Sequence, residues 1–228
     1  MYQRWLDLTF LHWEVPAADL QRLMPAGLTI DTFEGKAYVG LVPFRMRDIR
    51  PRLCPAVPGV SHFFETNVRT YVHVEGQGPG VWFFSLDAAN RIGAWLGRHW
   101  FKLPYHYAHL ALDSLNDGSL VCKGSRASDR SANYDVWVSG DGPCRPAEPG
   151  TLEFFLVERY LLYTVQSGHL MSGQVWHEPY RFRAVSADSV QESLLQASGI
   201  VRPNTKPLAH YSPGVDVEVF GLKRVGVK

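Results

Sequence analysis

The sequence has few cysteines, no excess of charge of one sign and no long apolar run, and each absence excludes a class of protein. Cys54, Cys122 and Cys144 are far apart and form no CxxC spacing, so neither a disulfide framework nor a zinc knuckle is indicated. A net charge of +1 without a basic stripe argues against a nucleic-acid partner. No run of about 20 apolar residues occurs, which argues against a membrane span.

Motifs that would identify a common cofactor or nucleophile are also missing. The N-terminal residues lack the apolar core of a signal peptide, so we expect a cytoplasmic protein. The sequence contains no GxxxxGK[ST] loop, no GxGxxG at the start of a helix and no GxSxG elbow. His106 and His109 have no third ligand near them in the sequence. We therefore expect neither a cofactor nor a metal.

What the sequence does contain is a pattern of many short strands. Its 228 residues are 46% hydrophobic and 13% aromatic, enough to bury a substantial core, and we expect one domain over 1–228. Hairpin patterns cover 28–46 and 67–88, and 151–165 is also typical of a strand. Helical spacing is limited to 17–25, 88–101 and 186–199. These patterns predict a mainly β (β-rich α+β) fold, an antiparallel barrel-like sheet with a few short peripheral helices.

The segment 63–72, FFETNVRTYV, is a predicted strand with an unusual polar face. Glu65, Asn67 and Arg69 alternate with apolar or β-branched residues, so the three polar side chains project from one face. Such a face is unremarkable if it meets water. If the strand is covered on both sides, its charges have to be paired or used, because a buried charge without a partner is costly. The apolar neighbouring segments favour the second alternative.

Other cations and polar groups are candidates for binding a small anion. Arg159 and Tyr163 share one face of a predicted strand, with Leu161 between them, and a guanidinium among tyrosines suits a carboxylate. A structural Glu–Arg pair across neighbouring strands is the alternative for this segment. Arg126 lies between small residues, where a long side chain can reach across a cavity, and His210 lies in a predicted loop before the last strand.

Seven stretches of the chain together resemble the DUF2071 family, also called YqjF-like proteins. They are 8–16, 23–46, 63–72, 80–88, 100–110, 151–164 and 210–222, so the resemblance covers essentially the whole chain in order. That family is largely uncharacterised and is grouped with the acetoacetate decarboxylase-like fold. The resemblance implies an antiparallel β-barrel-like domain around a central pocket.

The relation to acetoacetate decarboxylases also implies roles for particular residues. Those enzymes carry an aromatic-x-Glu strand, which Glu65 matches, and a later lysine that forms a Schiff base with the keto acid. Tyr105 stands where that lysine would be, and Lys102, three residues earlier, would point to the opposite face of a strand. We therefore expect no acetoacetate decarboxylase activity, with Glu65 and Tyr105 as the candidate catalytic pair.

Two functions are consistent with these features. The first is a lyase, hydratase or isomerase that converts a keto or hydroxy acid, with Asn67, Arg69, Arg126, Arg159, Tyr163 and His210 as candidate substrate-binding residues. The second is a non-catalytic metabolite-binding protein of the same fold. In both cases the expected partner is a small-molecule ligand, with a carboxylic acid as the candidate class, rather than nucleic acid or membrane. The expected state is a monomer or a small homo-oligomer.

Overall fold

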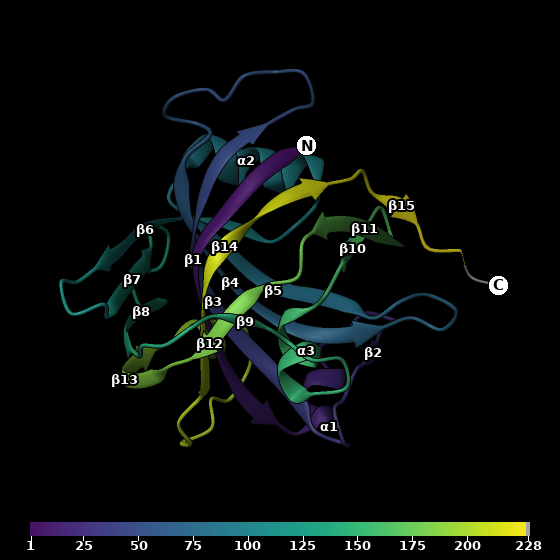
Figure 1. Cartoon of the computed structure of the whole chain (residues 1–228). Coiled ribbons are helices and arrows are strands. Elements are labelled where there is room, and N and C mark those ends of the chain that lie inside the picture. The colour runs from purple at the N-terminus through teal and green to yellow at the C-terminus, as the bar shows by residue number, and fades with distance from the viewer. Residues whose placement is uncertain (227–228) are drawn as a thin grey trace.

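Seven strands of the computed structural model, which describes residues 1–226, form a ring (Figure 1). The ring follows the order β5–β10–β11–β14–β1–β3–β4, and β4 pairs back to β5. These strands are β1 (Tyr2–Val15), β3 (Ala37–Arg50), β4 (Phe63–His73), β5 (Gly80–Ala88), β10 (Leu161–Gln166), β11 (His169–His177) and β14 (Leu208–Val219). The prediction of a mainly β, barrel-like fold is confirmed.

The sheet is mixed rather than purely antiparallel. β10 pairs with β5 in parallel at Leu162 and Val81, and β6 (Tyr105–Ser114) pairs with the other end of β5 in parallel. β6 continues into an antiparallel extension through β7 (Leu120–Arg126), β8 (Asn133–Ser139) and β13 (Ser186–Glu192). The remaining strands are the short β2 (Thr29–Ile30), β9 (Arg145–Pro146), β12 (Arg181–Ala184) and β15 (Lys223–Arg224).

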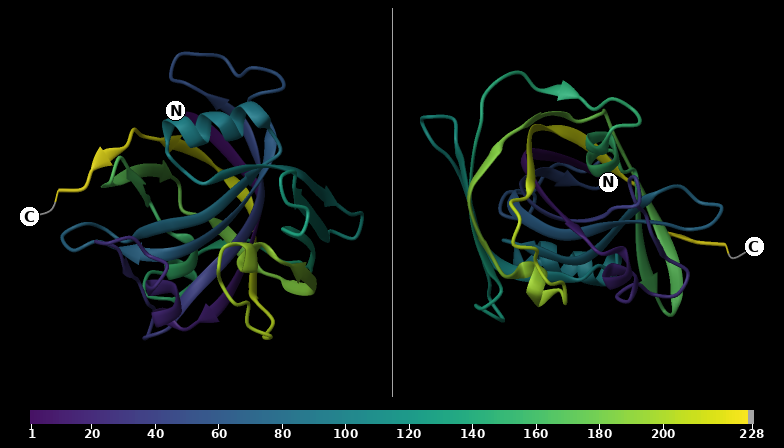
Figure 2. Two further views of the ribbon diagram at one scale, coloured as in Figure 1. Left: turned by 180° about the vertical axis from the view of Figure 1, so that it is seen from behind. Right: turned by 90° about the horizontal axis from the view of Figure 1, so that it is seen from below.

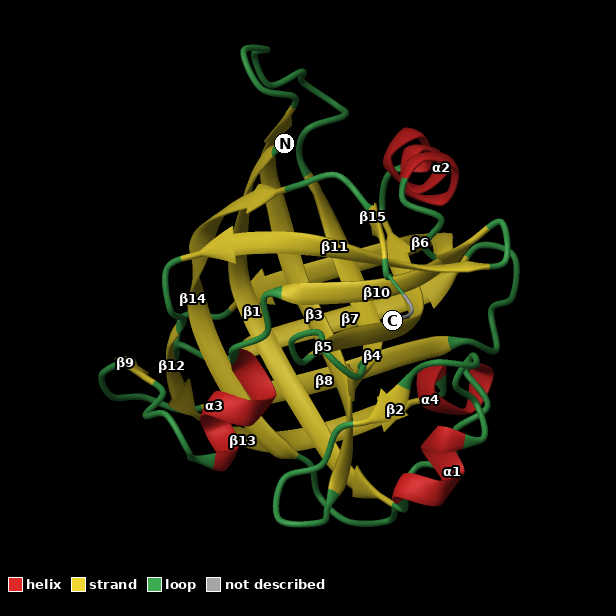
Figure 3. Cartoon of the chain, turned by 90° about the vertical axis from the view of Figure 1, so that its right-hand side faces the viewer, coloured by secondary structure: helices red, strands yellow, loops and turns green. Residues whose placement is uncertain are grey.

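The helices within residues 1–226 are short and flank the sheet (Figures 2 and 3), and one of them packs Leu156 and Val157 into the core inside the ring. They are α1 (Ala17–Gln21), α2 (Arg91–Trp100), α3 (Leu152–Val157) and α4 (Leu194–Ala197). Helices predicted within 17–25 and 88–101 are confirmed as α1 and α2. Within residues 1–226, no helix combines the length and the apolar character needed to cross a bilayer.

Three predictions of local structure differ from the structure. His210, predicted to lie in a loop before the last strand, lies within the strand β14 itself. The first half of 186–199, predicted as helix, is the strand β13, which pairs with β8, and only α4 is helical. The first half of 151–165, predicted as strand, is α3, because the Thr151 hydroxyl caps it by accepting a hydrogen bond from the Phe154 amide. Strand pairing thus outweighed the local helical pattern at 186–192, whereas a local capping signal outweighed the strand-like composition at 151–157.

Side chains on the two faces of the ring strands enter two different cores. In β1, Leu8 and Phe10 point inside the ring, whereas Leu11 and Trp13 point outside. The outer core is completed by the β6–β8 extension and by residues of α1 and α4, such as Leu20 and Leu194. The middle parts of β1, β3 and β4 are therefore covered on both faces, which explains the nearly continuous apolar run 37–44 in β3.

Candidate functional site

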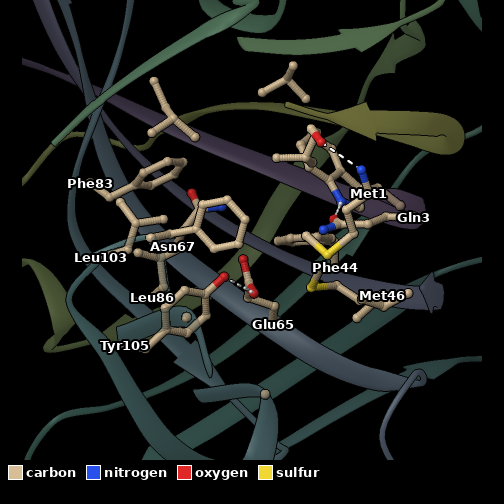
Figure 4. A pocket seen from close by; sticks show the side chains of 18 of the residues that line it. Met1, Gln3, Phe44, Met46, Glu65, Asn67, Phe83, Leu86, Leu103 and Tyr105 are labelled. Atoms are coloured by element: carbon tan, nitrogen blue, oxygen red, sulfur yellow. Dashed lines mark hydrogen bonds between the residues drawn. The ribbon is translucent and has the colours of Figure 1, made fainter. Parts of the chain in front are cut away.

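A cavity of about 280 Å³ lies inside the ring (Figure 4). Its volume is close to the lower end of the range of about 300–1,000 Å³ that is usual for ligand pockets. All seven ring strands contribute to its wall, for example through Leu8, Val42, Asn67, Phe83, Leu162, Val175 and Val219. Most of the lining side chains are apolar, so the few polar ones decide what the cavity can recognise.

The polar face of β4 forms part of this wall. Glu65, Asn67 and Arg69 line the cavity and are 4%, 5% and 8% exposed, respectively. On the other face of the strand, Val68 and Val72 belong to the outer core. The polar face of FFETNVRTYV is thus turned to an enclosed space and not to bulk water.

Glu65 and Tyr105 form a hydrogen-bonded pair in the cavity wall. The Tyr105 hydroxyl donates to Glu65 Oε2 at 2.9 Å (Figure 4). Burial raises the pKa of Glu65 to about 8, an effect that the Tyr105 hydrogen bond reduces and the nearby Asp87 carboxylate increases. Burial, together with Glu65, also raises the pKa of Tyr105 well above its ordinary value, so the phenol keeps its proton. Glu65 is therefore largely a neutral carboxylic acid at pH 7.

Two elements hold Tyr105 in this position. Its backbone begins β6 and pairs with Leu86, whose side chain also lines the cavity. Its ring packs against Gly97 of α2 so closely that a Cβ at Gly97 would lie 2.4 Å from ring carbons. Glycine at this position thus lets the helix approach the tyrosine that bonds to Glu65.

Arg69 and Asn67 bring unused hydrogen-bonding groups to the cavity wall. Arg69 Nη2 donates to the Leu156 carbonyl at 3.1 Å, and Nε has no partner in the structure. The guanidinium lies 5.5 Å from the Phe10 ring centroid and 5.8 Å from that of Tyr71. Within residues 1–226 no carboxylate pairs with Arg69, and Asn67 Oδ1 likewise lacks a donor.

Arg159 lines the same cavity but is already neutralised. Its Nη1 lies 2.7 Å from Asp31 Oδ2, and its Nε donates to the Phe155 carbonyl. Burial lowers the pKa of Arg159, while Asp31 opposes this shift. Arg159 is thus held in a structural ion pair, but its partner is Asp31, and the pair is not the Glu–Arg pair across neighbouring strands that the sequence left open as the alternative.

Three predicted binding residues lie outside the cavity. Arg126 points to the far face of β5, where its Nε contacts both carboxylate oxygens of Asp87 at 2.9 and 3.1 Å. The Tyr163 hydroxyl donates to the Gly78 carbonyl, and His210 packs edge-on against Phe182. The structure thus brings together Glu65, Asn67, Arg69, Tyr105 and Arg159, and separates these three from them.

No lysine lines the cavity within residues 1–226. Lys102 is exposed in the turn between α2 and β6, where its backbone adopts a positive φ of 52°. His106 points to the same side as Asp87, and burial with Arg126 and Arg98 lowers its pKa to about 4. No group of three or more His, Cys, Asp or Glu side chains in this part of the chain is placed to hold a metal ion.

The cavity opens between α2 and the loop 51–60, a feature that the sequence did not predict. Trp100 and Val57 line the cavity and are nevertheless 71% and 53% exposed. Pro51 and Pro55 also contribute to this rim. Apolar residues within the proline-rich segment 51–60 are the sequence signal that could have indicated the rim.

Comparison with known proteins identifies relatives along the whole chain. The model of the family DUF2071, "Uncharacterized conserved protein (COG2071)", matches residues 2–216. The chain is 34% identical to the uncharacterized protein YqjF of Bacillus subtilis (strain 168) over 224 residues, which cover 98% of this chain and 92% of YqjF.

Solved structures with the same fold are enzymes of low sequence identity. Acetoacetate decarboxylase from Legionella pneumophila has a TM-score of 0.71 at 14% identity, with 99% of this chain and 88% of that chain covered. The enduracididine biosynthesis enzyme MppR, with HEPES bound, has a TM-score of 0.70 at 12% identity, with 99% and 87% covered. These similarities show an acetoacetate decarboxylase-like fold. On the family match and the identity with YqjF, this chain belongs to the DUF2071 family.

Proposed function

We propose that the protein binds a small organic acid in the cavity inside the ring and that Glu65 and Tyr105 act on it as an acid–base pair. The observation that carries this proposal is the hydrogen-bonded Glu65–Tyr105 pair in a mostly apolar cavity, in which Arg69 has no carboxylate partner. The reaction class is that of a lyase, hydratase or isomerase acting on a keto or hydroxy acid. MppR, which has the same fold, has been crystallised in complex with pyruvate, and this supports the ligand class.

The chemistry follows from the direction of the hydrogen bond. Because Tyr105 donates to Oε2 of Glu65, the proton of the neutral carboxyl group is carried by Oε1. Oε1 can then donate to a carbonyl or hydroxyl oxygen of the ligand. A pKa of about 8 lies close enough to neutrality for Glu65 both to give and to take a proton. Since no lysine lines the cavity within residues 1–226, the proposed reaction involves no Schiff base.

Non-catalytic binding is the second candidate, and the lining of the cavity is compatible with it. A mostly apolar wall with a few polar groups is common to sites that convert a metabolite and to sites that only hold one. In that case Glu65 and Tyr105 would orient a ligand oxygen by hydrogen bonding alone. The two candidates share the binding site and differ in whether a proton is transferred.

Hydrogen exchange on bound acids separates the two candidates. Carboxylic acids that raise the melting temperature of the protein would be incubated with it in D₂O, and their carbon-bound protons followed by NMR. We expect exchange or conversion with the native protein and its loss in Glu65→Gln, with binding retained. Glu75→Gln, which makes the same change at an exposed turn residue, is the matched control. Binding without exchange would support the non-catalytic candidate, and the absence of any binding acid would refute the proposal.

A further inference from the structure

Arg69 is an arginine of the cavity wall that lacks a carboxylate partner within residues 1–226. Of the two arginines that line the cavity, Arg159 is paired with Asp31, whereas Arg69 has neutral partners: the Leu156 carbonyl, the Tyr71 side chain and the face of the Phe10 ring. Aromatic faces attract a guanidinium but do not neutralise its charge. A buried charge without a counter-ion is costly, so a ligand carboxylate at Arg69 gains from both charge pairing and bidentate hydrogen bonding.

This anion site is well separated from Glu65. Glu65 and Arg69 are four positions apart on β4, which places their Cα atoms about 13 Å apart. The Arg69 guanidinium lies against Tyr71, which is further along the strand in the direction away from Glu65. Consistent with this separation, Arg69 is not among the groups that shift the pKa of Glu65.

The wall between the two ends is mainly apolar. Val42 lies opposite Asn67 on β3, and Leu86 lies opposite it on β5. Phe83, which lies opposite Arg69 on β5, also lines the cavity (Figure 4). The middle of the cavity therefore suits hydrocarbon, with Asn67 as its polar group.

We propose that the ligand is a monocarboxylate whose carboxylate binds Arg69 and whose hydroxyl or carbonyl oxygen, several carbons away, binds Glu65 and Tyr105. This inference rests on the function proposed above and narrows its ligand class. A short 2-oxo or 3-oxo acid carries its two polar groups too close together to reach both ends of the cavity. A dicarboxylate would place a second negative charge beside Glu65, and no cation is among the groups that shift the pKa of this carboxyl group.

The test compares matched ligands by isothermal titration calorimetry. The probes are 8-hydroxyoctanoate, octanoate, octan-1-ol, suberate and acetoacetate. We expect 8-hydroxyoctanoate to bind most tightly and octanoate next, with octan-1-ol, suberate and acetoacetate each at least about tenfold weaker than 8-hydroxyoctanoate. The comparison of acid and alcohol uses the native protein, so it does not depend on any variant folding.

Two variants locate the ends of the ligand. Arg69→Met, which replaces the cation with an apolar side chain of similar length, should abolish the preference for octanoate over octan-1-ol. Leu86→Trp, which fills the middle of the cavity, should exclude 8-hydroxyoctanoate. The matched controls are Arg91→Met and Leu115→Trp, at two exposed positions, which should change neither result.

The outcomes separate this inference from the proposed function. If acetoacetate binds as tightly as 8-hydroxyoctanoate, the spacing inferred here is wrong and the proposed function stands. Equal affinity for octanoate and octan-1-ol would overturn the role of Arg69. Suberate binding as tightly as 8-hydroxyoctanoate would overturn the requirement for a neutral oxygen at Glu65. If no acid of any length binds, both the inference and the proposed function fail.

Discussion

Glu65 shows at the scale of a residue how burial changes the chemistry of a carboxyl group. The side chain is 4% exposed, and its hydrogen bond to Tyr105 offsets only part of the desolvation. Asp87, on the other face of the sheet, is also buried, but its pair with Arg126 limits the rise of its pKa to about 6. The same side-chain chemistry thus gives a structural ion pair on one face and a neutral acid in a cavity on the other.

The raised pKa of Glu65 predicts a specific pH dependence of stability. Folding raises this pKa from 4.5 to about 8, so the folded state binds more protons across that range. The contribution of Glu65 to the free energy of unfolding is therefore fully present below about pH 4.5 and is lost as the pH rises to about 8, by at most about 1.4 kcal/mol per pH unit. Glu65→Gln cannot ionise and should lack this loss.

Urea unfolding of native protein and Glu65→Gln, from about pH 5 to about pH 9, measures the difference. The variant should gain stability relative to the native protein with increasing pH. Glu75→Gln, at an exposed turn residue, should run parallel to the native protein. A constant difference between native protein and Glu65→Gln over the whole range would contradict the prediction.

At the scale of elements, α2 connects the rim of the cavity to its polar pair. The helix begins after Asn90, whose side chain caps it by accepting from the Gly93 amide, and it presents Gly97 to the ring of Tyr105. Trp100, on its last turn, lines the opening of the cavity. A change in the packing of α2 should therefore alter both the position of Tyr105 and the opening of the cavity.

Gly97→Ala should destabilise the protein in spite of the better helix propensity of alanine. The propensity gain is about 1 kcal/mol, but the new methyl group would lie 2.4 Å from the Tyr105 ring, and such overpacking costs about 1–3 kcal/mol. Gly93→Ala is the matched comparison, since its methyl group would meet the Phe63 ring at the milder distance of 3.0 Å.

Thermal unfolding measures both variants, and Gly97→Ala should show the larger decrease in melting temperature. It should also raise the pKa of Glu65 further by displacing the hydroxyl that stabilises the carboxylate form, as NMR titration of that carboxyl group would show. Gly97→Ala with a melting temperature at or above that of the native protein would show that the contact with Tyr105 relaxes without cost.

At the scale of the whole molecule, the ring depends on a short parallel pairing between strands that are distant in sequence. β5 and β10 meet at Val81–Leu162 and Trp82–Tyr163. Gly80 precedes this contact, and a Cβ there would lie 2.6 Å from the Leu161 carbonyl oxygen. The absence of a side chain at Gly80 therefore permits the approach that closes the ring around the cavity.

Gly80→Ala should loosen this closure. The clash is with backbone, which cannot rotate away as a side chain can, so we expect a loss of about 1–3 kcal/mol or more of unfolding free energy. Amide hydrogen exchange in 161–166 should accelerate more than exchange in β1 or β3, because the effect is local to the contact. Gly221→Ala, with open space around its Cβ position, is the control. If the amides of 161–166 exchange no faster in Gly80→Ala than in Gly221→Ala, this role of Gly80 is contradicted.

Much of this architecture could be predicted from local patterns in the sequence. The alternation in 63–72 placed Glu65, Asn67 and Arg69 on one face. The helices within 17–25 and 88–101 were predicted from the spacing of their apolar residues and from the glycine and proline residues at their ends. These features depend on residues close together in the chain, where propensity and period act directly. The segments 151–157 and 186–192 were predicted wrongly because capping and strand pairing outweighed their composition.

The sequence by itself determined that Glu65, Asn67 and Arg69 share one face of β4. Only the tertiary structure decided which of the three buried arginines Arg69, Arg126 and Arg159 pair with a carboxylate. Arg126 and Arg159 find Asp87 and Asp31 on strands or loops far away in the chain, whereas Arg69 meets no carboxylate within residues 1–226. Ion pairing and the enclosure of a cavity depend on contacts between distant segments, and no local pattern encodes them.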